Sequence, residues 1–537
     1  MYDYIIVGAG SAGCVLANRL SEDPSVRVLL LEAGGADRSL KIKIPAAFPE
    51  QFHTKLDWDF ATEPEPHVDG RRLYIPRGKA LGGSSSMNAM LYVRGRPLDY
   101  DGWEAQGAPG WGYADVLPYF KRSEDNVRGA SAYHGAGGPL HVAEQRSPRP
   151  MSARLLAASE AAGIPRIADY NGPEQDGASM FQVTQQNGRR FSAADAYLRP
   201  ALTRPNLEVR KNATVLGVEL DGERAVGVRV GRGRRGGVEV LRAEREVLLS
   251  AGAIGSPQLL QLSGIGAGEE LRAAGVEVRH ELPGVGRNLQ DHPFVTVIWE
   301  VSDTNTLYGA DKPKPLAEWL LRRSGKLTST VAEVVAFTRT RGGLPAPDIQ
   351  LHMGAAYYED HGADTYDGNC IVIAPTLVSP QARGRVWLRS ADPTAKPRII
   401  TNTLSEADDV RSLVAGVRLA REIAASSPLR ELIVTELKPG SGSVEDAELE
   451  ADLRRRLMLI YHPVGTARMS DTHEEAVVDS QLRVHGLQGL RVIDASIMPT
   501  ITGGNTNAPT IMIAERGADL IRSHPAAASV QSSGSVA

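Results

Sequence analysis

The hydrophobic pattern of the N-terminal segment predicts a strand, a turn, a helix and a second strand. Residues 4–7 are a short apolar run typical of a buried strand, and residues 8–13 follow at once as a glycine-rich turn. Apolar side chains then recur at helical spacing over residues 15–20, and residues 26–31 form another apolar run. Strands that alternate with a helix in this way favour an α/β fold with a parallel sheet.

The middle of the chain has a different pattern, in which short extended runs are separated by Pro, Gly and Asp. Residues 348–358, 370–378 and 385–389 are three such runs. Runs of this length, bounded by turn residues, predict the strands of an antiparallel sheet. We therefore expect a mainly antiparallel platform after the α/β segment.

Two helices are expected between this platform and the C-terminus. The first contains residues 410–423, whose apolar side chains fall on one face, and Ser405 is its expected N-cap. The second covers residues 444–457, with Ser443 as its expected N-cap. Acidic residues come early and arginines late in this second helix, which complements the helix dipole.

Charge and cysteine content exclude several classes of protein. The chain has 60 basic and 64 acidic residues, so it lacks the concentrated basic surface that nucleic-acid binding requires. Its two cysteines, Cys14 and Cys370, do not make a disulfide framework, and their spacing suits no metal site. There is no signal-peptide pattern, and no apolar run reaches the roughly 18 residues of a membrane span. We expect a cytoplasmic protein without a transmembrane segment, and peripheral membrane contact stays open.

The N-terminal turn has the G-x-G-x-x-G spacing of a dinucleotide-binding unit. Gly8 permits the tight turn, Gly10 lets a pyrophosphate approach the backbone, and Gly13 lets the helix pack closely on the strand. Glu32 ends the second strand, where it is placed to accept hydrogen bonds from an adenosine ribose. An acid at this place disfavours a 2′-phosphorylated nicotinamide cofactor. FAD and NAD both remain open on these residues alone.

Two further segments favour one cofactor. Residues 77–88 (RGKALGGSSSMN) predict a loop of small residues whose backbone amides suit a flat, polar cofactor. Residues 252–266 (GAIGSPQLLQLSGIG) predict a turn, a short helix and a second glycine-rich turn. Both segments resemble the signature patterns of the glucose–methanol–choline (GMC) oxidoreductases, in particular the choline dehydrogenase and alcohol dehydrogenase branch. The resemblance covers nearly the whole chain and implies that the cofactor is FAD.

The resemblance also implies which residues bind FAD. Residues 490–499 resemble the second FAD motif of such flavoproteins, which places Asp494 and Ala495 at the pyrophosphate–ribityl region and Val215 near the adenine. Met87 stands where some choline-oxidising members carry a His that is bonded covalently to the flavin, so non-covalent FAD is expected. The cofactor-binding residues so predicted are Gly8, Gly10, Ser11, Ala12, Gly13, Glu32, Ala33, Gly82, Gly83, Ser84, Asn88, Met90, Val215, Ala251, Asp494, Ala495, Asn505 and Thr506.

The predicted catalytic pair is His462 and Asn505. His462 lies in a Tyr-His-Pro-Val-Gly segment that resembles the family's segment with the catalytic base, and a histidine is suited to take a proton near neutral pH. Asn505 falls where the family has His or Asn, and an amide orients the substrate oxygen but takes no proton. The helix that follows is expected to point its N-terminus at the flavin pyrimidine, whose negative charge it would stabilise.

The substrate pocket is harder to predict than the catalytic pair. Glu333 and His352 resemble pocket positions of choline-oxidising relatives, although either is equally well explained as a structural polar residue. A choline-type site would want Trp before Glu333, where the chain has Val331 and Ala332, so a neutral primary or aromatic alcohol is favoured. The pocket residues predicted are Ile460, Tyr461, Glu333 and His352.

The expected reaction is FAD-dependent oxidation of an alcohol to an aldehyde, with proton abstraction by His462 and hydride transfer to the flavin. The electron acceptor is either oxygen or a quinone-type molecule, so an alcohol oxidase that acts on aryl or furan alcohols is the alternative to a dehydrogenase. A hydroxynitrile lyase, which shares the fold and keeps FAD without net redox chemistry, is a distant alternative.

The order of the patterns predicts a discontinuous two-domain enzyme. The FAD-binding Rossmann-like region is expected over residues 1–297, and a substrate domain built on the antiparallel sheet over residues 298–455, with part of residues 150–190. Residues 456–523 are expected to return to the FAD domain with the catalytic pair. Residues 524–537, rich in Ala, Ser and Val, are expected to be a disordered tail.

Overall fold

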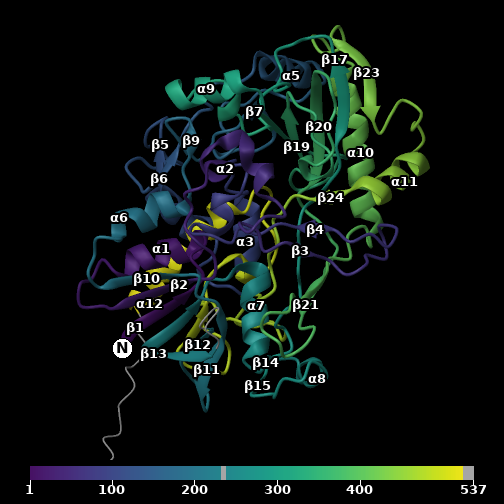
Figure 1. Cartoon of the computed structure of the whole chain (residues 1–537). Coiled ribbons are helices and arrows are strands. Elements are labelled where there is room, and N and C mark those ends of the chain that lie inside the picture. The colour runs from purple at the N-terminus through teal and green to yellow at the C-terminus, as the bar shows by residue number, and fades with distance from the viewer. Residues whose placement is uncertain (232–236, 524–537) are drawn as a thin grey trace, which may run out of the picture.

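The computed structural model of the chain describes residues 1–231 and 237–523, so the expected disordered tail lies outside the described residues. Two large sheets, each with its own hydrophobic core, organise the structure (Figure 1). One is mainly parallel and the other antiparallel. The expected combination of an α/β unit with an antiparallel platform is therefore confirmed, while the domain boundaries given above stay a prediction.

The parallel part of the first sheet brings the two ends of the chain together. Val7 pairs with both Leu31 and Leu249, and Leu249 also pairs with Val492. The carboxyl ends of four strands therefore meet at one edge, which is where ligands bind in such sheets. The parallel strands, in spatial order, are β10 (Leu207–Lys211), β2 (Val28–Glu32), β1 (Tyr2–Val7), β13 (Val238–Leu249) and β25 (Leu490–Val492). A hairpin of β11 (Val215–Asp221) and β12 (Arg224–Gly231) extends antiparallel from β13.

The second sheet is antiparallel and holds residues from widely separated parts of the chain. Its strands, in spatial order, are β23 (Ile433–Lys438), β17 (Val297–Val301), β20 (Cys370–Leu377), β19 (Ile349–Gly354), β18 (Val334–Thr338) and β7 (Gly177–Met180). Two short strands, β16 (Pro293–Phe294) and β24 (Met458–Leu459), pair with each other, and β16 also pairs with β20. Two of the three predicted extended runs, those at residues 348–358 and 370–378, contain β19 and β20.

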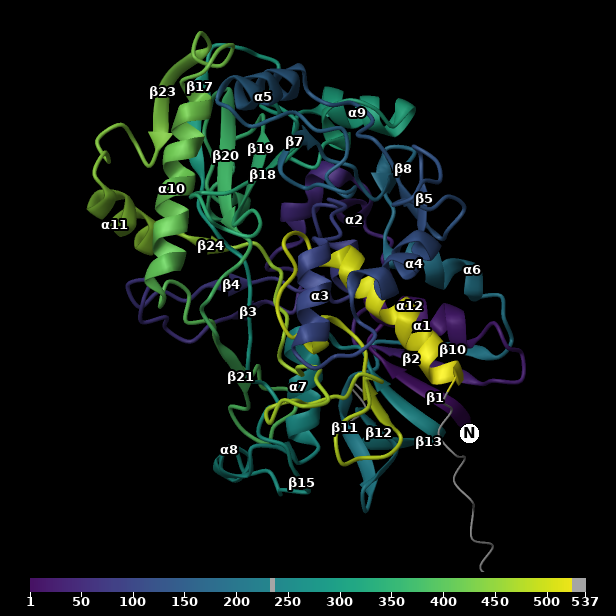
Figure 2. The same cartoon turned by 180° about the vertical axis from the view of Figure 1, so that it is seen from behind.

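Helices cover both sheets (Figure 2). Beside the parallel sheet, α1 (Ser11–Leu20) packs against the C-terminal helix α12 (Asn507–Ser523), which also contacts α4 (Tyr113–Ser123). On the platform, α10 (Ala407–Ala424) packs on β20 and β19, and α5 (Pro150–Ala161) packs on β7, β19 and β18. These contacts bury the apolar face that was predicted for α10.

The two expected N-caps are wrong by one and two residues. The N-cap of α10 is Glu406 rather than Ser405, because the chain is still turning at Ser405, whose N–H donates to the carbonyl of Asn402. Helix α11 (Asp446–Arg456) begins after Glu445 rather than Ser443, because Glu445 and Glu448 form a capping box, each bonding the other's backbone N–H.

The remaining elements are short. Among the described residues, the two-stranded ladders are β3 (Phe60–Ala61) with β4 (Tyr74–Ile75), β5 (Glu124–Asn126) with β6 (Leu140–Val142), β8 (Gln185–Gln186) with β9 (Arg189–Arg190), β14 (Ile265–Gly266) with β15 (His280–Glu281), and β21 (Arg385–Trp387) with β22 (Arg398–Ile400). The expected strand at residues 385–389 thus lies outside the platform. The other helices are α2 (Leu40–Lys43), α3 (Pro97–Ala105), α6 (Arg199–Ala201), α7 (Gly252–Leu262), α8 (Gly268–Ala273) and α9 (Pro313–Arg322). No helix in the described ranges is long and apolar enough to cross a bilayer.

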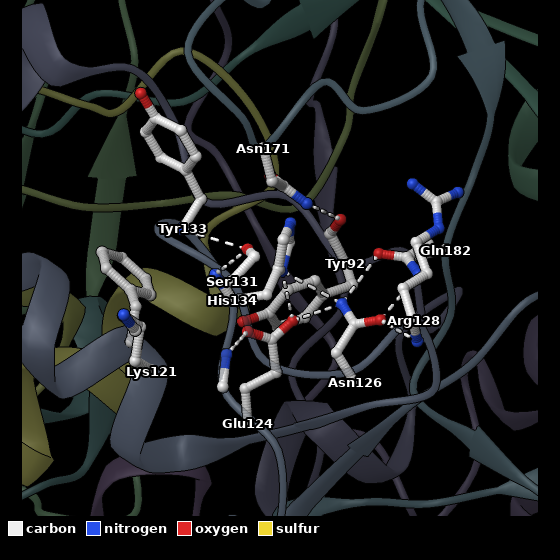
Figure 3. Close-up of polar contacts among 12 residues, drawn as sticks. Tyr92, Lys121, Glu124, Asn126, Arg128, Ser131, Tyr133, His134, Asn171 and Gln182 are labelled. Carbon is white, nitrogen blue, oxygen red and sulfur yellow. Dashed lines mark hydrogen bonds and ion pairs between the residues drawn. The ribbon is translucent and has the colours of Figure 1, made fainter.

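A buried polar network ties the segment after α4 to several loops (Figure 3). Figure 3 shows Glu124, Asn126 and His134 pointing toward one another. His134 lies between two carboxylates, with Nδ1 2.9 Å from Glu124 and Nε2 2.8 Å from Asp169, and Arg94 forms an ion pair with Glu124. Burial lowers the pKa of His134, but the hydrogen bonds to Asp169 and Glu124 outweigh it, so the pKa is raised overall. A protonated His134 therefore stabilises the fold.

His134→Gln should lower the melting temperature, and the loss should depend on pH. Removing a charged, hydrogen-bonded group from this network costs about 2 kcal/mol. Because the pKa of His134 is raised in the folded protein, its stabilisation is complete below the unfolded pKa of about 6.5 and is lost as the pH rises through the folded pKa. The difference in melting temperature between the variant and the wild type should therefore become smaller as the pH rises from mild acid to mild base. His141→Gln, at a more exposed His–Asp pair, is the control; a gap that widens with pH contradicts the assignment.

Candidate active site

A cavity of about 530 Å³ lies where the carboxyl edge of the parallel sheet meets the platform. Its wall includes Glu32 at the end of β2, Asp494 after β25 and His462 after β24. Its size falls in the range of pockets that enclose a cofactor or a small ligand. The first sheet and the platform each contribute one part of this wall.

The glycine turn after β1 is shaped by one close backbone contact. A Cβ atom on Gly13 would lie 1.8 Å from the carbonyl oxygen of Gly8, so only glycine fits there. Gly8 has a φ of +101°, and Gly83 from the second glycine loop packs so closely that its Cβ would lie 2.7 Å from the Cα of Gly10. No side chain caps the N-terminus of α1, so its backbone N–H groups are available to an anion.

Glu32 is held in place by the same turn. Its carboxylate accepts hydrogen bonds from the backbone N–H groups of Ala9 at 2.9 Å and Gly34 at 2.7 Å. Burial raises the pKa of Glu32 to about 7, although these two N–H groups act against the rise. Ala33 and Val215 line the cavity beside it. This end of the cavity is therefore small, apolar and supplied with one fixed acceptor.

Asp494 organises the loop that follows β25, and its carboxylate does not point free into the cavity. Its carboxylate accepts hydrogen bonds from the N–H of Gly252 at 2.8 Å, the hydroxyl of Ser256 at 2.5 Å, and both the N–H and the hydroxyl of Ser496. These bonds fix the start of α7 beside the loop after β25. Asp494 and Ala495 both line the cavity.

The structure brings most of the predicted site residues to this one cavity. Those that line it are Gly8, Gly10, Ser11, Ala12, Glu32, Ala33, Gly83, Ser84, Asn88, Met90, Val215, Ala251, Asp494, Ala495, Asn505, Thr506, His352, Ile460, Tyr461 and His462. Three do not line it. Gly13 and Gly82 act through the backbone instead, Gly13 by its contact with Gly8, and Gly82 by a turn with φ of +89° and a hydrogen bond to the carbonyl of Ala9.

Glu333 is the third residue outside the cavity wall, and its expected place in the substrate pocket is corrected. Its carboxylate accepts hydrogen bonds from the N–H of Arg149 and from the hydroxyls of Ser152 and Ser329, each at 2.6 Å. It is fully buried and anchors the start of α5 to the segment before β18. The structural alternative that the sequence left open is thus the one observed. His352 does line the cavity, with Nδ1 3.0 Å from the hydroxyl of Thr376.

His462 and Asn505 lie side by side in the cavity wall. The amide Nδ2 of Asn505 lies 3.2 Å from Nε2 of His462, and Oδ1 of Asn505 accepts a hydrogen bond from Gln350. The bond from Gln350 fixes the orientation of the amide, so Nδ2 donates to Nε2. Nε2 therefore carries a lone pair rather than a proton.

A second histidine fixes the other side of the His462 ring. Nδ1 of His292 lies 3.1 Å from Nδ1 of His462, and the two rings are nearly perpendicular. With Nε2 unprotonated, Nδ1 of His462 carries the proton and donates it to His292. Pairing of β16 with β24 produces this contact, because Phe294 lies opposite Met458 and the carbonyl of His292 accepts from the N–H of Ile460.

Sequence reasoning missed both His292 and its neighbour Asp291. Asp291 accepts hydrogen bonds from the backbone N–H groups of His462 at 2.7 Å and His292 at 2.8 Å, and burial raises its pKa to about 7. The available sequence signal was an acid and a histidine directly before a proline, next to a strand. Nothing local in that signal shows which residue they contact 170 positions later.

The site keeps its histidines neutral. The pKa of His462 is held well below its ordinary value, first by burial and then by His292, His352 and Arg77. Burial also lowers the pKa of His292 and of His352 to about 3. At neutral pH, His462 is therefore a neutral imidazole that is able to accept a proton.

The segment that carries His462 is strained and firmly held. Tyr461 has a φ of +70°, which is unfavourable for a residue with a bulky side chain, and its carbonyl accepts a hydrogen bond from Arg77 at 2.6 Å. Its hydroxyl contacts Nδ1 of His361 at 2.5 Å and Tyr358 at 3.3 Å. Aromatic side chains surround this end of the cavity: Phe48, Phe52, Phe294, Tyr358 and Tyr461.

Comparisons with known proteins identify the family of the chain. Models of the GMC oxidoreductase family match residues 2–294 and 380–514 of the chain. The chain belongs to the GMC oxidoreductase family. It is 44% identical to mitochondrial choline dehydrogenase of Mus musculus, over 98% of this chain and 90% of the relative. It is 42% identical to an alcohol dehydrogenase [acceptor] of Pseudomonas putida, over 97% and 96%.

Solved structures give the same result. Pyridoxine 4-oxidase from Mesorbium loti superposes with a TM-score of 0.89 at 32% identity, covering 98% of this chain and all of that one. A formate oxidase superposes with a TM-score of 0.91 at 28% identity, covering 97% of this chain and 98% of that one. This GMC oxidoreductase is therefore an FAD-dependent enzyme that acts on CH–OH donors.

The cavity of this GMC oxidoreductase fits FAD. The Gly8–Gly13 contact leaves the amides of α1 open to a pyrophosphate, and Glu32 offers an acceptor where a ribose would lie. The loop that contains Ser84 and Asn88 lines the same cavity as His462. These residues would hold the cofactor with its reactive end toward the histidine.

Gly13→Ala should abolish most FAD binding. The added Cβ would lie 1.8 Å from a backbone oxygen, so helix α1 must shift away from β1 and the turn must change shape. The measurement is the ratio of flavin to protein absorbance after purification. Gly35→Ala is the control, because its Cβ would meet only Asn212 at an ordinary 3.7 Å. Equal flavin content in both variants would show that the turn does not hold the cofactor.

His292→Leu and His292→Asn should separate the role of the hydrogen bond from that of packing. Leu cannot accept the proton of His462 Nδ1, so kcat should fall by about 10- to 100-fold. Asn has an acceptor oxygen near the place of Nδ1 and should recover most of the activity. Bound FAD and melting temperature serve as controls. The tautomer assignment fails if both variants lose the same activity.

Proposed function

We propose that the protein oxidises a neutral primary alcohol to an aldehyde, with His462 as the base and Asn505 as the group that orients the substrate oxygen. The observation that carries this proposal is the geometry around Nε2 of His462. His462 lines the cavity, its unprotonated Nε2 lies 3.2 Å from the Asn505 amide, and burial keeps the ring neutral at pH 7.

The protein's own residues account for the movement of the proton. An alcohol hydroxyl that enters beside Nε2 of His462 would donate its proton to the lone pair, and Nδ2 of Asn505 would donate to the same oxygen. Nδ1 of His462 keeps its bond to His292, which holds the ring while it becomes positively charged. When bound, FAD supplies the oxidant that accepts the hydride from the alcohol carbon.

Two features support the cofactor side of this proposal. Thr506 and Asn507 line the cavity at the N-terminus of α12, so the positive end of the helix dipole is offered to negative charge there. Met87 also lines the cavity and has no group that bonds covalently to a flavin carbon. FAD is accordingly proposed to be non-covalent, and it should be released into solution when the protein is denatured with acid.

The shape and charge of the cavity favour an uncharged, apolar substrate. In the described part of the chain, the carboxylates that line it are Glu32 and Asp494, and both lie at strand ends of the first sheet. Neither carboxylate is therefore placed beside His462 to pair with a quaternary ammonium, and Val331 and Ala332 line the cavity where a choline-type site would have Trp. Benzylic and medium-chain primary alcohols fit this environment better than choline.

We assign a quinone-type molecule as the electron acceptor. The support is the 42% identity, over nearly full length, to an enzyme named alcohol dehydrogenase [acceptor]. Relatives named oxygen-dependent choline dehydrogenase are 42–43% identical and favour oxygen instead. An oxygen-using alcohol oxidase is the second candidate, and the likeness to pyridoxine 4-oxidase favours it. The protein would act in the cytoplasm, as expected from its sequence.

An anaerobic screen of alcohols tests the substrate and the acceptor together. The flavin absorbance should bleach with benzyl alcohol at lower concentration than with choline, and a soluble quinone should restore it faster than oxygen does. Bleaching by choline alone would contradict the neutral substrate, and faster recovery with oxygen would establish the oxidase.

His462→Ala should lower the rate of anaerobic flavin bleaching by roughly 10²- to 10⁴-fold, the usual contribution of a general base. The lone pair of Nε2 is lost, while Asn505 still binds the substrate oxygen, so KM should change much less than kcat. Bound FAD should be retained, which serves as the control. A variant that bleaches at the wild-type rate would exclude His462 as the base.

A further inference from the structure

Helix α9 (Pro313–Arg322) is fixed to the surface by one buried side chain. Trp319 is 1% exposed, its Nε1 donates to the carbonyl of Gly188 at 2.8 Å, and it packs in a small apolar cluster with Ile44 and Ala47. The guanidinium of Arg323 lies 3.9 Å above the Trp319 ring. These contacts determine which face of α9 points outward.

The outward face of α9 is apolar. Leu316, Leu320 and Leu321 are 39%, 48% and 84% exposed, and Pro313 and Ala317 are exposed beside them. At the helical rotation of about 100° per residue, these five residues occupy one continuous sector of the helix, away from Trp319. An amphipathic helix of a monomeric protein normally has the opposite arrangement, with its polar face toward water. The apolar sector of α9 has no partner within the described part of the chain.

Unpaired cations flank this apolar sector. Lys312 directly precedes α9, and Lys314 lies next to Leu321 around the helix. Both are exposed, and neither forms an ion pair with a described residue, although Nζ of Lys312 lies 5.3 Å from the centre of the Tyr308 ring. Arg322 lies on the opposite face of the helix. The acidic residues beside them on the chain are Asp311 and Glu318. The local excess of positive charge stands out in a chain whose formal net charge is −4. Apolar side chains next to free cations are complementary to a lipid surface with anionic head groups.

The helix also lies close to the aromatic end of the cavity. Ala47, which packs with Trp319, belongs to a short helix, η1 (Pro45–Gln51), whose next residue, Phe48, lines the cavity. The segment that follows α9 continues through η5 (Lys326–Thr328) to residues 330–332, which line the cavity as well. A surface that binds α9 would therefore lie on the substrate side of the molecule. Figure 1 shows α9 at the top of the platform side, away from β11 and β12.

We propose that α9 docks the protein on an anionic lipid bilayer, with Leu316, Leu320 and Leu321 inserted among the lipids and Lys312 and Lys314 at the head groups. A second copy of the chain is a poorer occupant, because a twofold interface would bring the same unpaired cations against each other. Docking of this kind holds the protein in the plane of the interface and spans nothing. It does not depend on which alcohol the enzyme oxidises.

Co-sedimentation of the holoenzyme with vesicles tests the proposal. The protein should bind phosphatidylcholine vesicles that contain about one third phosphatidylglycerol, because the anionic lipids attract its cations. It should bind less at high salt, because salt screens this attraction. Leu321→Ser should weaken binding by about tenfold, from the loss of one buried leucine. Lys312→Gln with Lys314→Gln should weaken binding to the anionic vesicles by about fivefold or more and leave binding to pure phosphatidylcholine unchanged.

Leu202→Ser is the matched control, because Leu202 is 49% exposed, nearly the same as Leu320, but lies at the end of α6, away from α9. It should bind vesicles like the wild type. The proposal is overturned if the wild type stays in the supernatant with anionic vesicles, or if Leu321→Ser and Leu202→Ser bind equally. A dimer of the wild type that Leu321→Ser converts to a monomer, without vesicle binding, would assign the face to self-association instead. Anaerobic flavin bleaching by an alcohol should be the same in all these variants.

Discussion

The lateral pairing of β1, β13 and β25 is the constraint on which the site depends. Val7, Leu249 and Val492 lie side by side in register, although they come from the beginning, the middle and the end of the chain. Parallel strands in register end at the same edge, so the glycine turn, the start of α7 and the Asp494 loop are delivered to one place. The hydrogen bonds from Gly252 and Ser256 to Asp494 then hold the last two together.

The position of His462 depends on a second, much smaller pairing. Strands β16 and β24 contain two residues each, yet they set His292 beside His462 at the end of the platform. Asp291 adds hydrogen bonds to the backbone of both histidines, and Arg77 from the glycine loop holds the carbonyl of Tyr461. These contacts maintain the strained φ of Tyr461, so His462 is positioned by both halves of the molecule.

Burial governs the chemistry of the site more than any single charge does. Three histidines lie at or beside the aromatic end of the cavity, and desolvation is the first cause of the lowered pKa of each. A neutral His462 is able to accept a proton, and the carboxylates among the described lining residues, Glu32 and Asp494, lie at strand ends of the first sheet. The same reasoning, applied to the surface, separates α9 from the other helices, because its apolar residues were left in water beside unpaired cations.

The sequence alone determined the features that are local in the chain. The strand, turn and helix around Gly8 and Gly13, and the acid Glu32, are specified by residues that lie close together in the sequence. The resemblance to the family added the prediction of His462 and Asn505. Helix ends were misplaced because capping depends on which of several neighbouring polar side chains reaches the free N–H groups, as Glu445 and Glu448 do. Only the tertiary structure decided that Glu333 is an internal anchor, that His292 sets the proton position on His462, and that the apolar side of α9 faces outward. Each of these depends on a contact between residues that are far apart in sequence, and hydrophobic periodicity records that a face is apolar but not what will cover it.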